Sequence, residues 1–373
     1  MLMQRRLALT LLCLAGVALN TWITCNYLVP GAWKGKNDFL GLYAGARLAG
    51  TSRLYDPEAA RETQLREAGE TLESQRFIRL PYYALMLKPV GLLPYRPAYG
   101  VWLALSVLSL AIFAALWPAG TTGWLICCWF LPGFVAVFNG QDAPMLLLWV
   151  ALAVYLTKRD RQFAAGMVLA LCASKYHLAI LLPFVVLAQG RWRMLAGSLV
   201  AGAAMLAVSF GVAGRRWPWE YADVVTDPRI HPSVIHMPSF HGMQIGTPLQ
   251  ILMTLLVVLC VVVTARCASF EWGLAIALAA GVLVGFHTYL ADCVIFLPAI
   301  IQAIQVKALR LPSIALATPV PWLLLQLPPP QPNLTRALML MLVIGIAVTR
   351  RGSEPVLDEI LPQEAANPAG EGR

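Results

Sequence analysis

Long apolar stretches, separated by short polar or basic segments, recur from one end of the chain to the other. A membrane-spanning helix needs about 20 predominantly apolar residues, so we expect each stretch to form a helix in a bilayer. The first stretch follows Arg5 and Arg6 and is longer than the apolar part of a signal peptide, which favours an uncleaved helix. The twelve predicted spans are 7–29, 97–116, 123–138, 143–157, 163–173, 178–188, 194–213, 248–265, 272–286, 289–305, 312–327 and 334–349.

Clusters of Lys and Arg follow the fourth, sixth, eighth, tenth and twelfth predicted spans, and the positive-inside rule puts them on the cytoplasmic side with Arg5 and Arg6. Both termini are then cytoplasmic. This topology requires two short helices, and not one span, over 163–188. The two helices meet at the polar sequence Ser174-Lys175-Tyr176-His177. Irregular backbone at that depth is tolerated only where it faces a protein cavity. The clusters lie at 158–161, 191–193, 266, 307–310 and 350–351.

Two longer polar segments, at about 30–80 and 214–247, remain on the opposite, extracytoplasmic side. In the first, residues 57–76 mix acidic and basic side chains, which is typical of a helix at the membrane interface or in solvent. Residues 80–94 are apolar but interrupted by prolines, which predicts a re-entrant or juxtamembrane element. We expect a single all-α transmembrane domain over 1–351 and a disordered cytoplasmic tail over 352–373.

The composition agrees with a membrane protein: 59% of the 373 residues are hydrophobic and 13% are charged, with a mean hydropathy of +0.67. A soluble globular fold is excluded. The net charge of +9 arises from Lys and Arg between apolar segments, which indicates topology and phosphate binding and not nucleic acid. The eight cysteines have neither disulfide nor zinc spacing.

We predict no metal and no cofactor. The sequence has no P-loop, which disfavours ATP-driven transport, and no HExxH or G-x-S-x-G motif, which disfavours metal or serine hydrolysis.

Asp38 lies just beyond the outer end of the first predicted helix. A carboxylate at the membrane boundary is a candidate general base, because partial burial tunes its pKa. The alternative is an N-cap for a helix over 39–48, since Asp is a favoured capping residue.

A polar patch, Asn139, Gln141 and Asp142, lies between two predicted helices on the outer side. A tight turn at Asn139-Gly140 explains part of it without any function. Three polar side chains at an apolar junction also suit the hydroxyl groups of a sugar, so both interpretations stay open.

Lys175 at the polar junction is the cation that is hardest to explain as solvated surface. An ammonium group at membrane depth is costly unless it is paired or faces water, and a phosphate is a suitable anionic partner. The alternative is an interhelical salt bridge to Asp142 or Asp292.

His287 and Asp292 lie at another outer helix junction. Their spacing does not place them on one face of a straight helix, so a bend is needed to bring both to one site. A structural role for His287 is the alternative. Among the basic and aromatic residues of 214–247, His241 is close to the next predicted helix and is the best candidate to face a site.

A series of short motifs extends over most of the chain. In the order of these motifs and in their placement in the predicted topology, the chain resembles glycosyltransferase family 87. They are Asn37-Asp38-Phe39, Tyr43, Ala44, Arg47, Leu54-Tyr55-Asp56, Leu92-Leu93-Pro94, Trp102, Asn139-Gly140-Gln141, Gly166, Leu169, Ala173-Ser174-Lys175, His287 to Asp292, and Leu297-Pro298. The family contains integral membrane enzymes of the GT-C type, among them mycobacterial mannosyltransferases of phosphatidylinositol mannoside synthesis.

The resemblance implies transfer of a sugar, usually mannose, from a polyprenyl-phosphate carrier to a lipid or glycan acceptor. The transfer would take place with inversion, without a nucleotide sugar, and on the extracytoplasmic side of a bacterial inner membrane. Asp38 matches the first-loop aspartate that serves as catalytic base in GT-C enzymes, which favours the catalytic role without excluding a cap. Lys175 and His287 match polar positions of the family's cavity, where contact with the donor phosphate is expected.

Two departures from the family pattern concern the donor and acceptor more than the reaction class. Tyr-Pro-Pro after the first loop is replaced by Leu80-Pro81-Tyr82, and Lys-Pro by Lys175-Tyr176. A transporter or flippase of a lipid-linked or anionic substrate is the main alternative, because broken helices with a buried Lys also suit a site at the membrane midplane. An assembly subunit is a third hypothesis, and it predicts tolerance of substitutions at Asp38, Lys175 and His287.

Overall fold

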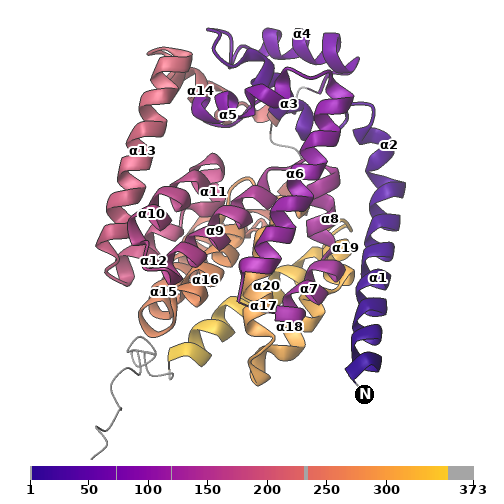
Figure 1. The fold of residues 1–373 in the computed structure, drawn as a ribbon, viewed down its shortest axis with the longest axis vertical. Coiled ribbons are helices and arrows are strands. Elements are labelled where there is room, and N and C mark those ends of the chain that lie inside the picture. Colours follow the sequence, from indigo (N-terminus) through magenta and orange to yellow (C-terminus); the bar gives the residue numbers. More distant parts are fainter. Residues whose placement is uncertain (1, 73, 119, 231–233, 352–373) are drawn as a thin grey trace, which may run out of the picture.

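The computed structural model describes residues 2–72, 74–118, 120–230 and 234–351, and every regular element in these ranges is a helix (Figure 1). The predicted all-α class is therefore confirmed. The tail 352–373, predicted to be disordered, lies outside the described residues.

Five helices are long and apolar enough to cross a membrane, which identifies an integral membrane protein. Two further pairs of helices are bent, by 63° between α7 and α8 and by 118° between residues 162–179 and α12, and each pair is at most one more span. The five are α1 (Leu2–Tyr27), α6 (Tyr95–Leu116), α13 (Trp192–Ala213), α15 (Thr247–Cys267) and α20 (Gln331–Arg351). The bent pairs consist of α7 (Gly120–Trp129), α8 (Leu131–Phe138), α10 (Gln162–Ala170), η1 (Leu171–Lys175), α11 (Tyr176–Ala179) and α12 (Leu182–Ala188).

The structure thus has five to seven spans by length and composition among the described residues, in place of the twelve predicted. The other apolar stretches form shorter helices. Residues 312–327 are divided between two of them, because Pro319 holds Thr318 in an extended conformation, with φ −90° and ψ 160°. The shorter helices are α9 (Ala143–Lys158), α16 (Phe270–Val284), η5 (Leu290–Phe296), α17 (Leu297–Ala303), η6 (Lys307–Leu309), α18 (Arg310–Ala317) and α19 (Pro319–Leu324).

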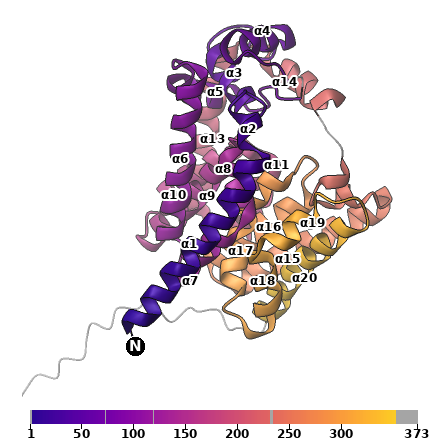
Figure 2. The ribbon, with the colours of Figure 1, turned by 90° about the vertical axis from the view of Figure 1, so that its right-hand side faces the viewer.

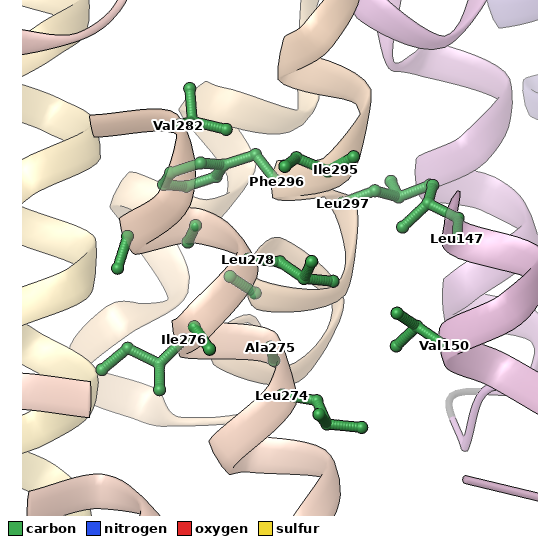
Figure 3. Close-up of a cluster of buried hydrophobic side chains, with 14 of the residues drawn as sticks. Leu147, Val150, Leu274, Ala275, Ile276, Leu278, Val282, Ile295, Phe296 and Leu297 are labelled. Atoms are coloured by element: carbon green, nitrogen blue, oxygen red, sulfur yellow. The ribbon is translucent and has the colours of Figure 1, made fainter. Parts of the chain in front are cut away.

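The centre of the molecule is built around α16, whose residues are buried almost without exception. A helix that is apolar on every side is stable inside a protein as well as in lipid, which is why composition alone overcounts spans. Figure 3 shows side chains of α9, α16, η5 and α17 in this core. At Gly281 of α16, a Cβ atom would lie 2.1 Å from the carbonyl oxygen of Leu178, so only glycine allows α11 to pack this closely.

The turns that carry the Lys and Arg clusters lie at one end of the molecule, the lower end in Figure 1. Lys158 forms an ion pair with Glu271 at 3.1 Å, and the Gln189 side chain donates to the carbonyl oxygen of Ala265 at 2.9 Å. Both ends of 163–188 therefore lie at this end of the molecule, an arrangement that agrees with the two short helices predicted there. The sharp bend of this segment lies at 180–181 and not at 174–177, because Pro183 lacks the N–H that would continue the helix.

The two long polar segments lie at the opposite end, where Figure 2 shows α4 and α14 together. Arg76, after α4, forms an ion pair with Asp227, after α14, at 2.7 Å. The predicted helix within 57–76 is α4, and the stretch 80–94 forms one regular helix, α5. The elements here are α2 (Val29–Ala32), α3 (Phe39–Leu48), α4 (Pro57–Ala68), α5 (Pro81–Gly91), α14 (Trp217–Thr226), η2 (Pro228–Ile230), η3 (Val234–His236) and η4 (Phe240–Met243).

Candidate active site

A cavity of about 740 Å³ lies where the polar segments meet the upper ends of the helices. Part of the lining is apolar and includes residues of α1, among them Trp22, which is 62% exposed. Another part is polar. Its polar lining includes Asp38, Gln75, Arg76, Arg79, Asn139, Gln141, Lys175, His177, His236, His287, Tyr289 and Asp292.

Asp38 occupies the N-cap position of α3, but its side chain makes no capping hydrogen bond. The neighbouring Asn37 caps the helix instead, since its Oδ1 accepts from the backbone N–H of Leu40 at 3.2 Å. The Tyr95 hydroxyl fixes Asn37 by donating to the same oxygen at 3.0 Å. The capping interpretation of Asp38 is therefore wrong in this structure, and its carboxyl group is available to line the cavity.

The carboxyl group of Asp38 is held by the turn between α8 and α9. Asn139 donates through Nδ2 to Asp38 Oδ2 at 2.6 Å, and Gln141 donates through Nε2 to the same oxygen. The backbone N–H of Asp38 donates to the carbonyl oxygen of Asn139 at 3.0 Å. The predicted turn is present, and two of the three polar side chains in the patch are directed to Asp38.

Burial raises the pKa of Asp38 to about 6, even though the hydrogen bond from Gln141 lowers it. The negative charge of Asp292 adds to the increase, and the positive charge of Lys175 opposes it. A carboxyl group that titrates near neutral pH can accept a proton in its ionised form and hold it afterwards, as a general base requires.

Lys175 is paired, as the salt-bridge alternative predicts. Its Nζ lies 3.3 Å from Asp142 Oδ1 and contacts Asp292 Oδ1, and it donates to Gln141 Oε1 at 2.6 Å. The side chain is only 2% exposed. An ammonium group this deeply buried needs such partners, because desolvation of a lone charge is prohibitive.

Asp142 also binds Arg79, in the bidentate geometry that guanidinium and carboxylate groups favour. Nε and one terminal nitrogen of Arg79 lie 2.7 and 2.9 Å from the two carboxylate oxygens of Asp142. In the sequence, Arg79 is only the end of a polar segment. Arg79 lies directly before an apolar, proline-containing helix, and this position could have identified it as a buried residue. A charged side chain at that point becomes buried when the helix packs against the protein.

Of the four histidines in the part of the chain that the structure describes, three line the cavity and one does not. His287 and Asp292 both line it, since the chain bends between them at the start of η5. His241 is exposed on η4 and lies outside the cavity lining, whereas His236 of the same segment contributes to it. His236 donates through Nδ1 to the carbonyl oxygen of Leu325 at 3.0 Å. His177, two residues after Lys175, also lines the cavity, although no sequence pattern marks it as a site residue.

Gly140 makes the close contact between the turn and Asp38 possible. Its φ of +71° suits glycine, and a Cβ there would lie 2.5 Å from the Cβ of Phe39. Gly140→Ala is expected to displace the turn and to destabilise the protein by at least about 1 kcal/mol more than Gly69→Ala. Gly69 is a matched control because its φ is +72° and nothing lies within 4 Å of its Cβ position. Thermal unfolding in detergent measures both; equal losses would contradict the close contact.

Comparison with known proteins gives one match. The family model of glycosyltransferase family 87 matches residues 77–298. No curated protein and no solved structure matches the chain. The matched range includes Asn139, Gln141, Asp142, Lys175 and His287, and it begins after Asp38.

Proposed function

Because the chain belongs to glycosyltransferase family 87, we propose that this membrane-integral glycosyltransferase moves a hexosyl group, a mannosyl group first of all, from a polyprenyl-phosphate carrier to a lipid or glycan acceptor. The observation that supports this best is the position of Asp38. Its carboxyl group, with a pKa of about 6, lines a cavity that is polar on one side and bounded by exposed apolar residues of α1 on the other.

In the proposed reaction, Asp38 is the general base. It removes the proton from an acceptor hydroxyl while that oxygen forms a bond to the anomeric carbon of the donor sugar. The bond between the anomeric carbon and the phosphate oxygen breaks at the same time, and its electron pair leaves with polyprenyl phosphate. Attack from the face opposite the phosphate inverts the anomeric configuration, as in glycoside chemistry with a single displacement.

The leaving phosphate already carries its charge, so it needs electrostatic stabilisation and no proton. Cationic and polar groups of the cavity support this role: Arg76, Arg79, His236 and His287 all contribute to its lining. Asn139, Gln141, Asp142 and Asp292 lie on the same polar side or directly behind it and are the proposed surroundings of the sugar. No metal ion is required by this scheme.

The apolar side of the cavity favours a lipid-linked donor over a water-soluble one. Leu19 and Trp22 of α1 line the cavity and are 40% and 62% exposed. A lipid chain can therefore lie against α1 with its phosphate directed to the polar side, and this arrangement buries apolar surface of the carrier. We place the site on the extracytoplasmic face of a bacterial inner membrane, with the basic turns and both termini in the cytoplasm.

Transfer by the purified protein in nanodiscs tests the proposal. Radiolabelled polyprenyl-phosphate-mannose is incubated with a lipid extract, and products are separated by chromatography; we expect label in a new glycolipid. Polyprenyl-phosphate-glucose and a nucleotide-linked mannose are run in parallel, and transfer from the nucleotide sugar alone would contradict the lipid-linked donor. Movement of the lipid-linked sugar between leaflets without a new glycosidic bond would instead identify a transporter.

The rate of transfer is expected to fall on the acid side with a midpoint near pH 6. Below this pH Asp38 is protonated, so it cannot accept the acceptor proton; above it the carboxylate is available. The dependence of kcat/KM on pH at limiting acceptor measures this midpoint in the free enzyme. A rate that stays constant from pH 5 to pH 8 would exclude a base with the raised pKa of Asp38.

A further inference from the structure

Gln141 connects Asp38 to Lys175. Its Oε1 accepts from the Lys175 ammonium group at 2.6 Å, and its Nε2 donates to Asp38. An ammonium group carries only donors, so it requires the oxygen of the Gln141 amide to face it. The amide nitrogen is thereby turned to Asp38, where its N–H donor favours the ionised carboxylate.

Three groups of the protein surround the Lys175 ammonium. It donates to Gln141 Oε1 at 2.6 Å and to Asp292 Oδ1, and its Nζ forms an ion pair with Asp142 Oδ1 at 3.3 Å. The acceptors are themselves fixed: Asp142 is bound by Arg79, and Asp292 accepts from the backbone N–H of Tyr289 at 2.9 Å. Lys175 is therefore held in a fixed position by two carboxylates and the Gln141 amide.

We propose that Lys175 is a positioning residue for Asp38: it orients the Gln141 amide, which keeps the Asp38 carboxylate ionised and in place. This role differs from contact with the donor phosphate. The inference rests on the proposed function of Asp38 as base, but the orientation of Gln141 has a consequence that is measurable without any substrate.

Several groups face Asp38 and influence its ionisation. Asn139 and Gln141 donate to it from the turn between α8 and α9, and Gln75 also interacts with it. The charged or titratable groups are Lys175 at the end of η1, and Asp292 and Tyr289 at the start of η5. Any test must therefore separate the hydrogen bond of Gln141 from the charge of Lys175.

Two variants make this separation. Gln141→Leu removes the connecting amide and leaves every charge in place. The double variant Lys175→Met/Asp292→Asn removes one positive and one negative charge, so the net charge near Asp38 is unchanged while Gln141 loses its orienting partner. The asparagine can still accept from the backbone N–H of Tyr289, which keeps the start of η5 capped.

Labelling with a hydrophobic carbodiimide reports on Asp38 directly, because the reagent reacts with protonated carboxyl groups. The labelled fraction of Asp38 is measured by mass spectrometry from pH 4.5 to 8.5 in nanodiscs. We expect the midpoint to rise by about one pH unit in both variants, the size expected for loss of a hydrogen bond to a charged group. Gln189→Leu, at the opposite end of the molecule, is the matched control and is expected to keep the wild-type midpoint.

Unchanged midpoints in both variants, or wild-type Asp38 that is not labelled at any pH, would overturn the proposal. Where transfer is measurable, the acid limb of kcat/KM should move with the labelling midpoint and the KM for the donor should change little. A large increase in donor KM in Lys175→Met/Asp292→Asn, with an unmoved acid limb, would identify Lys175 as a phosphate contact. A shifted labelling midpoint without transfer from any donor would support the positioning role and contradict the proposed function instead.

Discussion

Asp38→Asn is expected to lower the rate of transfer by roughly 10²–10⁴-fold, the range that general bases contribute, while the protein stays folded. Asparagine has nearly the same shape as aspartate, but its amide cannot accept a proton at neutral pH. The change also removes a buried carboxyl group whose ionisation is unfavourable in the folded protein, as its raised pKa shows. We therefore expect thermal stability in detergent to be close to that of the wild type.

Asp56→Asn is the matched control for this experiment. Asp56 accepts from the backbone N–H groups of Glu58 and Ala59 at the start of α4, outside the cavity lining. Asparagine is also a good N-cap, so transfer by this variant should equal that of the wild type. Full activity in a correctly inserted Asp38→Asn protein would exclude Asp38 as the base.

The helical class and the return of 163–188 to one side could be predicted from the sequence, because apolar stretches and basic clusters report on membrane topology. The number of spans could not. α16 is as apolar as a lipid-facing helix, yet it is surrounded by protein, and a hydropathy pattern does not say which of the two environments a helix occupies.

The candidate site was predictable as a set of polar residues at helix junctions but not as a set of contacts. Asp142 and Asp292 are predicted partners of Lys175, and both contact it. The role of Asp38 was ambiguous because Asn37 and Asp38 are both good capping residues. Only the structure shows that Asn37 makes the capping hydrogen bond, which it accepts from the backbone N–H of Leu40. Arg79 was missed since its partner Asp142 is 63 positions away in the sequence, a separation that no local pattern reveals.

The pairing of Arg79 with Asp142 connects the end of the first polar segment to the start of α9 at the polar side of the cavity. Both side chains are almost completely buried, at 7% and 0% exposure. Because desolvation offsets most of the Coulomb attraction in a buried pair, its presence says little about net stability. Removal of one partner strongly lowers stability, since it leaves the other charge buried and unpaired.

Asp142→Ala is therefore expected to destabilise the protein by about 3–5 kcal/mol, the largest stability effect that we predict. The variant leaves the Arg79 guanidinium without a carboxylate, and it removes one of the two carboxylates that pair with Lys175. Unfolding by denaturant in mixed micelles measures the loss against Glu58→Ala, a carboxylate in an exposed ion pair with Arg61. The exposed variant should hardly change stability, because surface ion pairs contribute little.

The double variant Arg79→Met/Asp142→Leu separates the charge effect from loss of packing. It removes both members of the buried pair and leaves Lys175 with Asp292, so no uncompensated charge remains. We expect it to recover most of the stability that Asp142→Ala loses, since apolar replacements of a buried pair are often neutral or better. If the double variant is as unstable as Asp142→Ala, the hydrogen-bond geometry of this pair, and not its charge balance, holds the polar side of the cavity together.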